Sequence, residues 1–149
     1  MAEKPIPPSA QDAVPEPVPV RIGEVAESGE TYLETILVIK ERTEDGVVRA
    51  VDIANELGFS KPSVSRALGL LKEKELIKIS QAGTILFTPQ GRALAEKIFR
   101  RHQLLTILIK HIANVPADIA EHDACRIEHV ISDETFEGVV RYLEDNKLL

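Results

Sequence analysis

The sequence predicts a mainly α-helical protein with one small β-hairpin. Apolar residues recur at the spacing of amphipathic helices in successive segments after residue 27. Two short alternating runs, at residues 76–79 and 84–88, are rich in β-branched residues and flank turn residues, which predicts a hairpin. The hairpin follows two short helices joined at Gly58. The expected fold is therefore a winged helix-turn-helix domain followed by a helical domain.

Charge divides the chain into three parts. The net charge is −6, yet residues 49–110 carry 11 Lys and Arg against 5 Asp and Glu, while residues 1–48 and 111–149 are each acidic by 6 charges. A basic middle segment between acidic ends is typical of a DNA-reading segment joined to a cation-binding one. We expect a flexible Pro-rich arm at residues 1–27, a DNA-binding domain at 28–92, and a helical dimerisation and metal-binding domain at 93–149.

The first helix is expected from about residue 28 to residue 43. Tyr32, Ile36 and Ile39 form its apolar stripe, and the turn residues 44–46 end it. Glu30, Thr31 and Glu34 lie in its first turns. The default expectation for these polar residues is a solvated face.

The second helix of the helix-turn-helix is expected to read DNA. Ser60 is a good N-cap and Pro62 fits the first helical turn. Hydroxyls and cations near a helix N-terminus suit phosphate anchoring and base-edge contacts in a major groove. The pattern also occurs in helical pairs that do not bind DNA. The candidate DNA-binding residues are Lys61, Ser63, Ser65 and Arg66.

Three more helices are expected after the hairpin. A long one spans residues 89–113, a second begins at Pro116 and carries Cys125, Glu128 and His129, and the last spans residues 133–145. Two apolar helices after a DNA-binding module are most simply a dimer interface, because a two-fold axis matches a palindromic operator.

The only cysteine belongs to a candidate metal site. If their segment is helical, Cys125, Glu128 and His129 are spaced i, i+3 and i+4, so they share one helix face and can converge on one cation. A mixed sulfur, oxygen and nitrogen donor set favours a first-row transition metal over calcium or magnesium. The spacing is equally compatible with an ordinary amphipathic helix.

Four motifs together carry a family resemblance. The chain resembles the diphtheria-toxin-repressor family of metal-dependent transcriptional regulators, and its short C-terminus is similar to the manganese-transport-regulator branch. The motifs are ETYLETI at residues 30–36, SKPSVS at 60–65, RHQLL at 101–105, and ACRIEHV at 124–130 followed by SDE at 132–134.

The resemblance implies a ligand set of Glu34, His102, Cys125, Glu128 and His129. Thr31 stands where the manganese branch has Asp and the iron branch has Met, and is the weakest candidate. Cys125 matches the iron branch and Glu34 the manganese branch, so Fe(II) and Mn(II) are the expected cofactors.

These features predict a homodimeric, metal-activated repressor that binds double-stranded operator DNA. Nothing in the sequence resembles a membrane span or signal peptide, so a cytoplasmic protein without membrane attachment is expected. One alternative is a winged-helix regulator that senses a small molecule or the oxidation of Cys125. A second is an enzyme with Cys125 and His129 as a nucleophile and base, but no oxyanion-hole motif accompanies them, so no enzymatic activity is expected.

Overall fold

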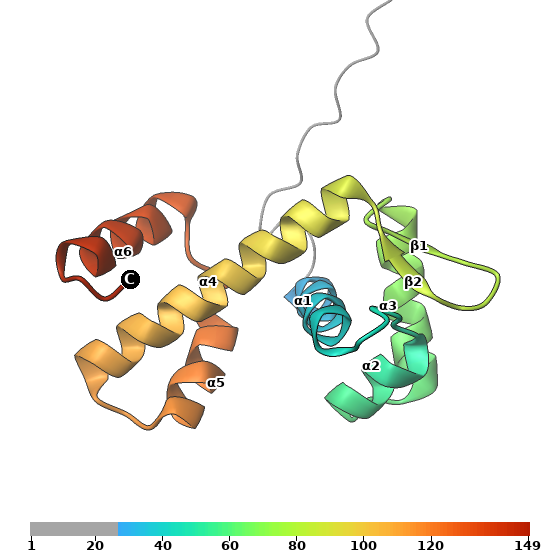
Figure 1. The fold of residues 1–149 in the computed structure, drawn as a ribbon, viewed down its shortest axis with the longest axis horizontal. Helices are drawn as coiled ribbons and strands as arrows, with labels where there is room; N and C mark the ends of the chain where they lie inside the picture. Colours follow the sequence, from blue (N-terminus) through green and yellow to red (C-terminus); the bar gives the residue numbers. More distant parts are fainter. Residues whose placement is uncertain (1–26) are drawn as a thin grey trace, which may run out of the picture.

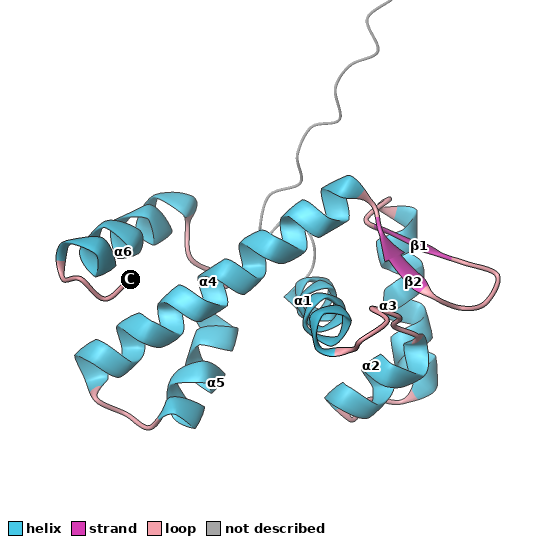
Figure 2. Cartoon of the chain, in the orientation of Figure 1, coloured by secondary structure: helices cyan, strands magenta, loops and turns pink. Residues whose placement is uncertain are grey.

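The computed structural model describes residues 27–149, which form helices and one two-stranded hairpin (Figures 1 and 2). The mainly helical fold class predicted from the sequence is confirmed. The Pro-rich arm expected at residues 1–27 lies outside the described residues, apart from Glu27. In chain order the elements are α1 (Glu27–Arg42), α2 (Ala50–Leu57), α3 (Lys61–Glu73), β1 (Ile77–Ile79), β2 (Ile85–Phe87), α4 (Pro89–Ala113), α5 (Ala117–Ile127) and α6 (Asp133–Asp145).

Helices α1 to α3, the hairpin and the first half of α4 enclose one hydrophobic core. Gly58 ends α2 in the left-handed conformation, and the Ser60 side chain accepts a hydrogen bond from the backbone N–H of Ser63 at the start of α3. The strands are antiparallel, with Ile77 opposite Phe87. The core joins α1 to α3 through Leu33, Ile36, Leu37, Val64, Leu68 and Leu71. Because these residues interdigitate, α1 and α3 form one packed unit.

Helix α4 connects this unit to α5 and α6, which lie along its other half (Figure 1). Thr88 caps its start and Asn114, with φ of 51°, ends it in the left-handed conformation. Helix α1 packs against α4 as well as against α3, so it lies where the two halves meet. Within residues 27–149, no helix combines the length and apolar character needed to cross a bilayer.

The predicted position of two candidate ligands within a helix is wrong. Helix α5 ends at Ile127, so Glu128 is its C-cap and His129 lies in the turn that follows. Glu128 keeps helical φ and ψ of −56° and −26°, and its N–H donates to the carbonyl of Ala124 at 3.0 Å. The side chain of Glu128 therefore still follows the helical path, whereas the turn directs that of His129.

Gly91 allows α4 to begin directly against the hairpin. A Cβ atom at this position would lie 1.8 Å from the carbonyl oxygen of Leu76 and 2.7 Å from its carbon. The same carbonyl accepts a hydrogen bond from the N–H of Thr88 at 3.1 Å, and the Thr88 hydroxyl donates to the carbonyl of Glu75 at 2.7 Å. Any side chain at position 91 would push the start of α4 away from the hairpin.

We expect Gly91→Ala to lower the free energy of unfolding by about 3 kcal/mol, the upper end for overpacked sites, because the clash is with backbone. Gly69→Ala is the matched control: it also lies within a helix, and its new Cβ would meet no atom within 4 Å. That control should gain roughly 0.5–1 kcal/mol from helix propensity. Chemical denaturation measures both, and equal stability of the two variants would contradict the close approach.

Candidate metal centre

Four potential metal ligands from two parts of the fold converge near the junction of α1, α4 and α5. Glu34 comes from α1, Cys125 from α5, and Glu128 and His129 from the end of α5 and its following turn. One ligand atom from each lies within 4.8 Å of the others. Residues of both halves of the chain would thus contact one ion.

The solvated face expected for the start of α1 is wrong. Glu34 is only 9% exposed, and Glu30 is completely buried. Sequence reasoning did not place Glu30 at the cluster, yet its carboxylate Oε1 lies 3.0 Å from Nδ1 of His129. The sequence signal available was the position of Glu30 one helical turn before Glu34, which puts both carboxylates on the same face of α1.

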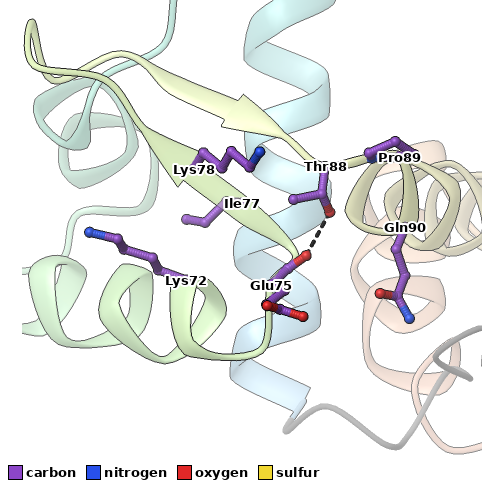
Figure 3. Close-up of a pocket in the computed structure, with 7 residues that line it drawn as sticks. All are labelled: Lys72, Glu75, Ile77, Lys78, Thr88, Pro89 and Gln90. Atoms are coloured by element: carbon purple, nitrogen blue, oxygen red, sulfur yellow. Dashed lines mark hydrogen bonds between the residues drawn. The ribbon is translucent and has the colours of Figure 1, made fainter. Parts of the chain in front are cut away.

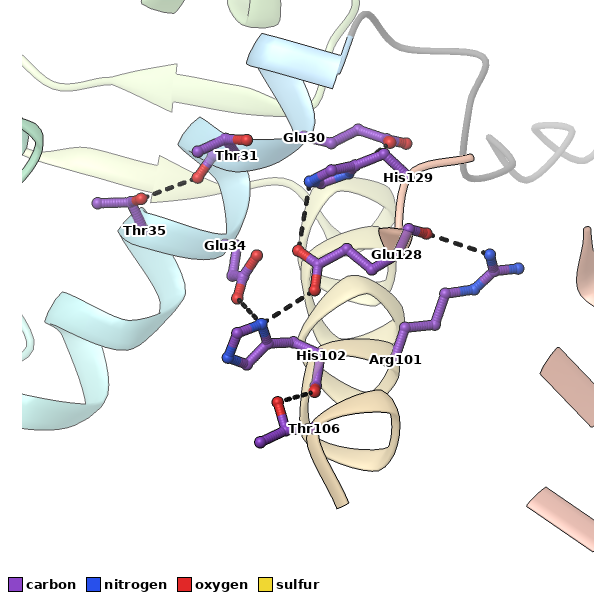
Figure 4. A network of polar contacts seen from close by, with 9 residues as sticks. All are labelled: Glu30, Thr31, Glu34, Thr35, Arg101, His102, Thr106, Glu128 and His129. Carbon is purple, nitrogen blue, oxygen red and sulfur yellow. Dashed lines mark hydrogen bonds and ion pairs between the residues drawn. The ribbon is translucent and has the colours of Figure 1, made fainter. Parts of the chain in front are cut away.

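Two buried atoms at the centre of the cluster have no hydrogen-bond partner: Oε1 of Glu128 and Nε2 of His129. They face each other at 3.3 Å, and Glu128 is completely buried (Figure 4). Leaving buried polar atoms unpaired costs free energy, which a shared ligand offsets. The cluster offers one thiol, two carboxylates and one imidazole, and this donor set fits a first-row transition metal.

Arg101 fixes the backbone that carries two of these candidate ligands, Glu128 and His129. Its buried guanidinium donates to the carbonyls of Glu128 at 3.2 Å and Ile131 at 2.8 Å, and it also pairs with Asp133. The turn after α5 is thereby tied to α4. Glu128 and His129 are held in place from the backbone side.

His102 lies beside the four-residue cluster. Its Nδ1 is 3.0 Å from Oε2 of Glu128 and 3.7 Å from Oε1 of Glu34, so it contacts both carboxylates from α4 (Figure 4). Thr31 lines a hollow of about 250 Å³ together with Glu34 and Cys125. The Thr31 carbonyl accepts the hydroxyl of Thr35 at 2.8 Å. The roles of His102 and Thr31 as ligands remain predictions.

The cluster holds extra protons when no metal neutralises it. Burial, then the neighbouring Glu128, raises the pKa of Glu34 to about 8, and burial raises the pKa of Glu128 to about 7. Burial lowers the pKa of His129, but the neighbouring Cys125, Glu30 and Glu128 outweigh it and raise the pKa to about 10. A bound cation would replace these protons.

We therefore expect opposite pH responses from metal-free and metal-loaded protein. The folded state binds more protons than the unfolded chain, above pH 4.5 through Glu34 and Glu128 and above pH 6.5 through His129, so the metal-free protein loses stability as the pH rises to about 10. Metal binding releases protons, so the increase in melting temperature caused by Mn(II) should be larger at pH 8 than at pH 6. Thermal melts with Mn(II) or chelator measure this, and an increase independent of pH would contradict the proton exchange.

The candidate DNA-binding side chains share the exposed side of α3. Lys61, Ser63, Ser65 and Arg66 are all exposed, while Val64, Leu68 and Leu71 are buried as the periodicity predicts. The hydroxyl of Ser60 donates to that of Ser63 at 2.9 Å. The first turn of α3 is thus ordered by its own cap and presents two cations and two further hydroxyls to solvent.

A separate hollow of about 510 Å³ lies where α3, β1 and α4 meet (Figure 3). Its lining combines Ile77 and Pro89 with Lys72 and Lys78. The lining includes neither Cys nor His, so it lacks the donors of a transition-metal site. Its lysines add instead to the basic surface around α3 and the hairpin.

Two family models match consecutive parts of the chain. The N-terminal DNA-binding domain of iron-dependent repressors matches residues 24–84, and the metal-binding and dimerisation domain of iron-dependent repressors matches residues 88–147. The chain belongs to the iron-dependent repressor family. The resemblance inferred from the four sequence motifs is thereby confirmed.

Individual relatives agree with this assignment. The diphtheria toxin repressor of Corynebacterium efficiens is 34% identical over 123 residues, which are 82% of this chain and 52% of that protein. The iron-dependent repressor IdeR of Mycobacterium tuberculosis is 31% identical over 126 residues, 83% of this chain and 53% of that protein. This chain therefore spans about half the length of the curated relatives it matches.

Solved structures of the family show the same fold. The manganese regulator SloR superimposes with a TM-score of 0.70 at 28% identity, covering 78% of this chain and 53% of that one. A manganese-dependent transcriptional repressor in complex with manganese superimposes with a TM-score of 0.71 at 26% identity, covering 78% of this chain and 52% of that one. The helical fold with its hairpin is therefore shared with this family.

Proposed function

We propose that the protein is a metal-dependent transcriptional repressor that binds operator DNA when loaded with Fe(II) or Mn(II). The observation that carries this proposal is the cluster of Glu34, Cys125, Glu128 and His129, which brings a carboxylate of α1 to the donors at the end of α5. Relatives named as iron-dependent and manganese-dependent repressors support the choice of metals. A bound metal would supply positive charge that holds these donors together.

The arrangement links the metal to DNA recognition through α1. Glu34 is a ligand from the helix whose core residues pack against α3, whereas Cys125, Glu128 and His129 come from the other half of the chain. Without a cation, burial disfavours the ionised forms of Glu34 and Glu128, and the neighbouring Glu128 further raises the pKa of Glu34. With a cation, α1 and the attached α3 are held at one position relative to the end of α5.

The coupling expected from this link is of ordinary allosteric size. A coupling free energy of roughly 1–3 kcal/mol between metal binding and DNA binding changes DNA affinity by about 5- to 150-fold. By reciprocity, operator DNA would tighten metal binding by the same factor. A switch of this size responds to metal concentrations around the dissociation constant of the site.

We further infer a homodimer with residues 28–92 as the DNA-binding domain and 93–149 as the dimerisation and metal-binding domain. Apolar side chains at the end of α4 and around α5 are exposed, Val130 by 72% and Ile112 by 63%. Next to them is a hollow of about 640 Å³ with Ile109 and Ile127 in its lining. Such a contiguous apolar surface is typical of an interface, and the family's dimerisation domain supports a second copy as its occupant.

The proposal is tested by DNA retention from a library of genomic fragments with Fe(II), Mn(II) or a chelator. The salt concentration is kept near ~150 mM because phosphate contacts make affinity steeply salt-dependent. Selection of a palindromic fragment only with metal is the expected result. Equal selection with chelator would contradict the metal switch and favour sensing of a small molecule or of Cys125 oxidation.

A further inference from the structure

Glu30 is a buried acidic residue that lies next to the metal centre but outside the group of four ligands. It belongs to the first turn of α1 and has no exposed surface. Its Oε1 lies 3.0 Å from Nδ1 of His129, a residue 99 positions later in the chain. A buried carboxylate is costly unless it is paired, so this contact calls for a specific role.

The two nitrogens of His129 face different partners. Nδ1 faces Glu30, while Nε2 makes no hydrogen bond and has an ion-pair contact of 3.3 Å with Oε1 of Glu128 (Figure 4). A carboxylate only accepts hydrogen bonds, so Nδ1 of His129 carries the hydrogen in this pair. Nε2 is then the nitrogen that a cation would bind in place of the second ring proton. Imidazole ligands are commonly oriented by such a carboxylate partner.

We propose that Glu30 is a positioning residue of the metal centre, which fixes the ring of His129 through Nδ1 and directs Nε2 at the metal. The inference rests on the proposed metal-binding function. Glu30 also raises the basicity of the imidazole, since its negative charge stabilises positive charge on the ring. It does not touch the metal and differs in this from Glu34.

The same contact gives α1 a second link to the other half of the chain. Glu34, one helical turn later, contributes a ligand, whereas Glu30 holds a ligand that the other half provides. Arg101 fixes the backbone of the turn that carries His129. Glu30 then sets the orientation of the His129 ring. A metal held by Nε2 would draw charge from the imidazole, and the Nδ1–H would then donate more strongly to Glu30. Helix α1 is therefore held both by the metal and by a ligand of the metal.

Co(II) binding to the full chain tests this role, because its visible spectrum reports both occupancy and ligand field. We expect Glu30→Gln, which keeps shape and a hydrogen-bond acceptor but removes the charge, to weaken Co(II) binding by about 10- to 100-fold in competition with a chelating dye. Glu30→Ala should weaken binding further and alter the ligand-field bands at saturation. Glu41→Gln, an exposed residue of the same helix, is the matched control.

The outcomes are distinguishable. Weaker binding and shifted bands in the Glu30 variants, with Glu41→Gln like the wild type, support the positioning role. If Glu30→Gln is folded by circular dichroism and binds Co(II) within twofold of the wild type with unchanged bands, the inference is overturned. If the wild type itself fails to bind Co(II), the proposed metal centre fails, and the inference fails with it.

Discussion

Replacing Glu128 with Gln is expected to abolish metal-dependent DNA binding while leaving a folded protein. Glu128 is completely buried, and its carboxylate lies 3.3 Å from Nε2 of His129 and 3.0 Å from Nδ1 of His102. The amide keeps the size of the side chain but removes the negative charge that a cation requires. The loss of metal affinity should exceed the roughly 10- to 100-fold effect that is typical for residues outside the ligand shell.

The same variant should be more heat-stable than the wild type without metal. Burial raises the pKa of Glu128 to about 7, so holding it ionised at pH 8 costs stability that Gln does not lose. The expected increase in melting temperature at pH 8 is a few degrees, at roughly 3 °C per kcal/mol for a chain of this size, and it should vanish at pH 5.

Calorimetry in the presence of chelator measures the change in melting temperature of Glu128→Gln. Titration with Mn(II) measures its loss of metal affinity. Glu144→Gln, an exposed residue of α6, controls for the change in net charge. A variant that still binds Mn(II) with wild-type affinity would show that Glu128 is not a ligand. If the variant is less stable than the wild type without metal, the carboxylate of Glu128 is already well paired in the metal-free wild type.

Substitutions on the exposed side of α3 are expected to weaken DNA binding. Depending on the residue, the substitution also relaxes sequence specificity or weakens binding to all sequences alike. Arg66 and Lys61 are both exposed on this helix. If Arg66 reads a base edge with its two-pronged guanidinium, Arg66→Gln lowers operator affinity by roughly 5- to 150-fold and relaxes specificity at one position. Lys61→Gln removes a phosphate contact, so it should reduce the slope of log affinity against log salt by about 1.

Fluorescence anisotropy on operator and scrambled DNA separates these effects. Arg141→Gln is the control, because it removes one positive charge from exposed surface of α6 on the other side of the molecule. Metal affinity should be unchanged in all three variants. Equal losses in Arg141→Gln and Arg66→Gln would mean that overall charge, and not α3, determines binding.

Local sequence signals predicted most of the fold because capping and periodicity act within a few residues. Helix α4 begins and ends at the predicted residues, with Thr88 and Asn114 as its caps. The end of α5 was predicted too late, because the turn at Glu128 and His129 is held by Arg101 from a distant helix. Tertiary contacts of this kind leave no local pattern.

The metal cluster was predictable only in part for the same reason. The spacing of Cys125, Glu128 and His129 suggested a site, and the family resemblance added Glu34. The burial of Glu30 depends on His129 docking against α1, so a solvated face was the natural expectation from the sequence. Side chains that position ligands across a domain junction have no spacing rule.

The central claim is that one metal ion joins α1 to the end of α5. Anomalous diffraction from crystals grown with Mn(II), recorded on both sides of the metal absorption edge, tests it most directly. The account predicts an anomalous peak enclosed by the side chains of Glu34, Cys125, Glu128 and His129. A peak enclosed by other residues, or a metal-loaded crystal in which Glu34 points away from the ion, would contradict it.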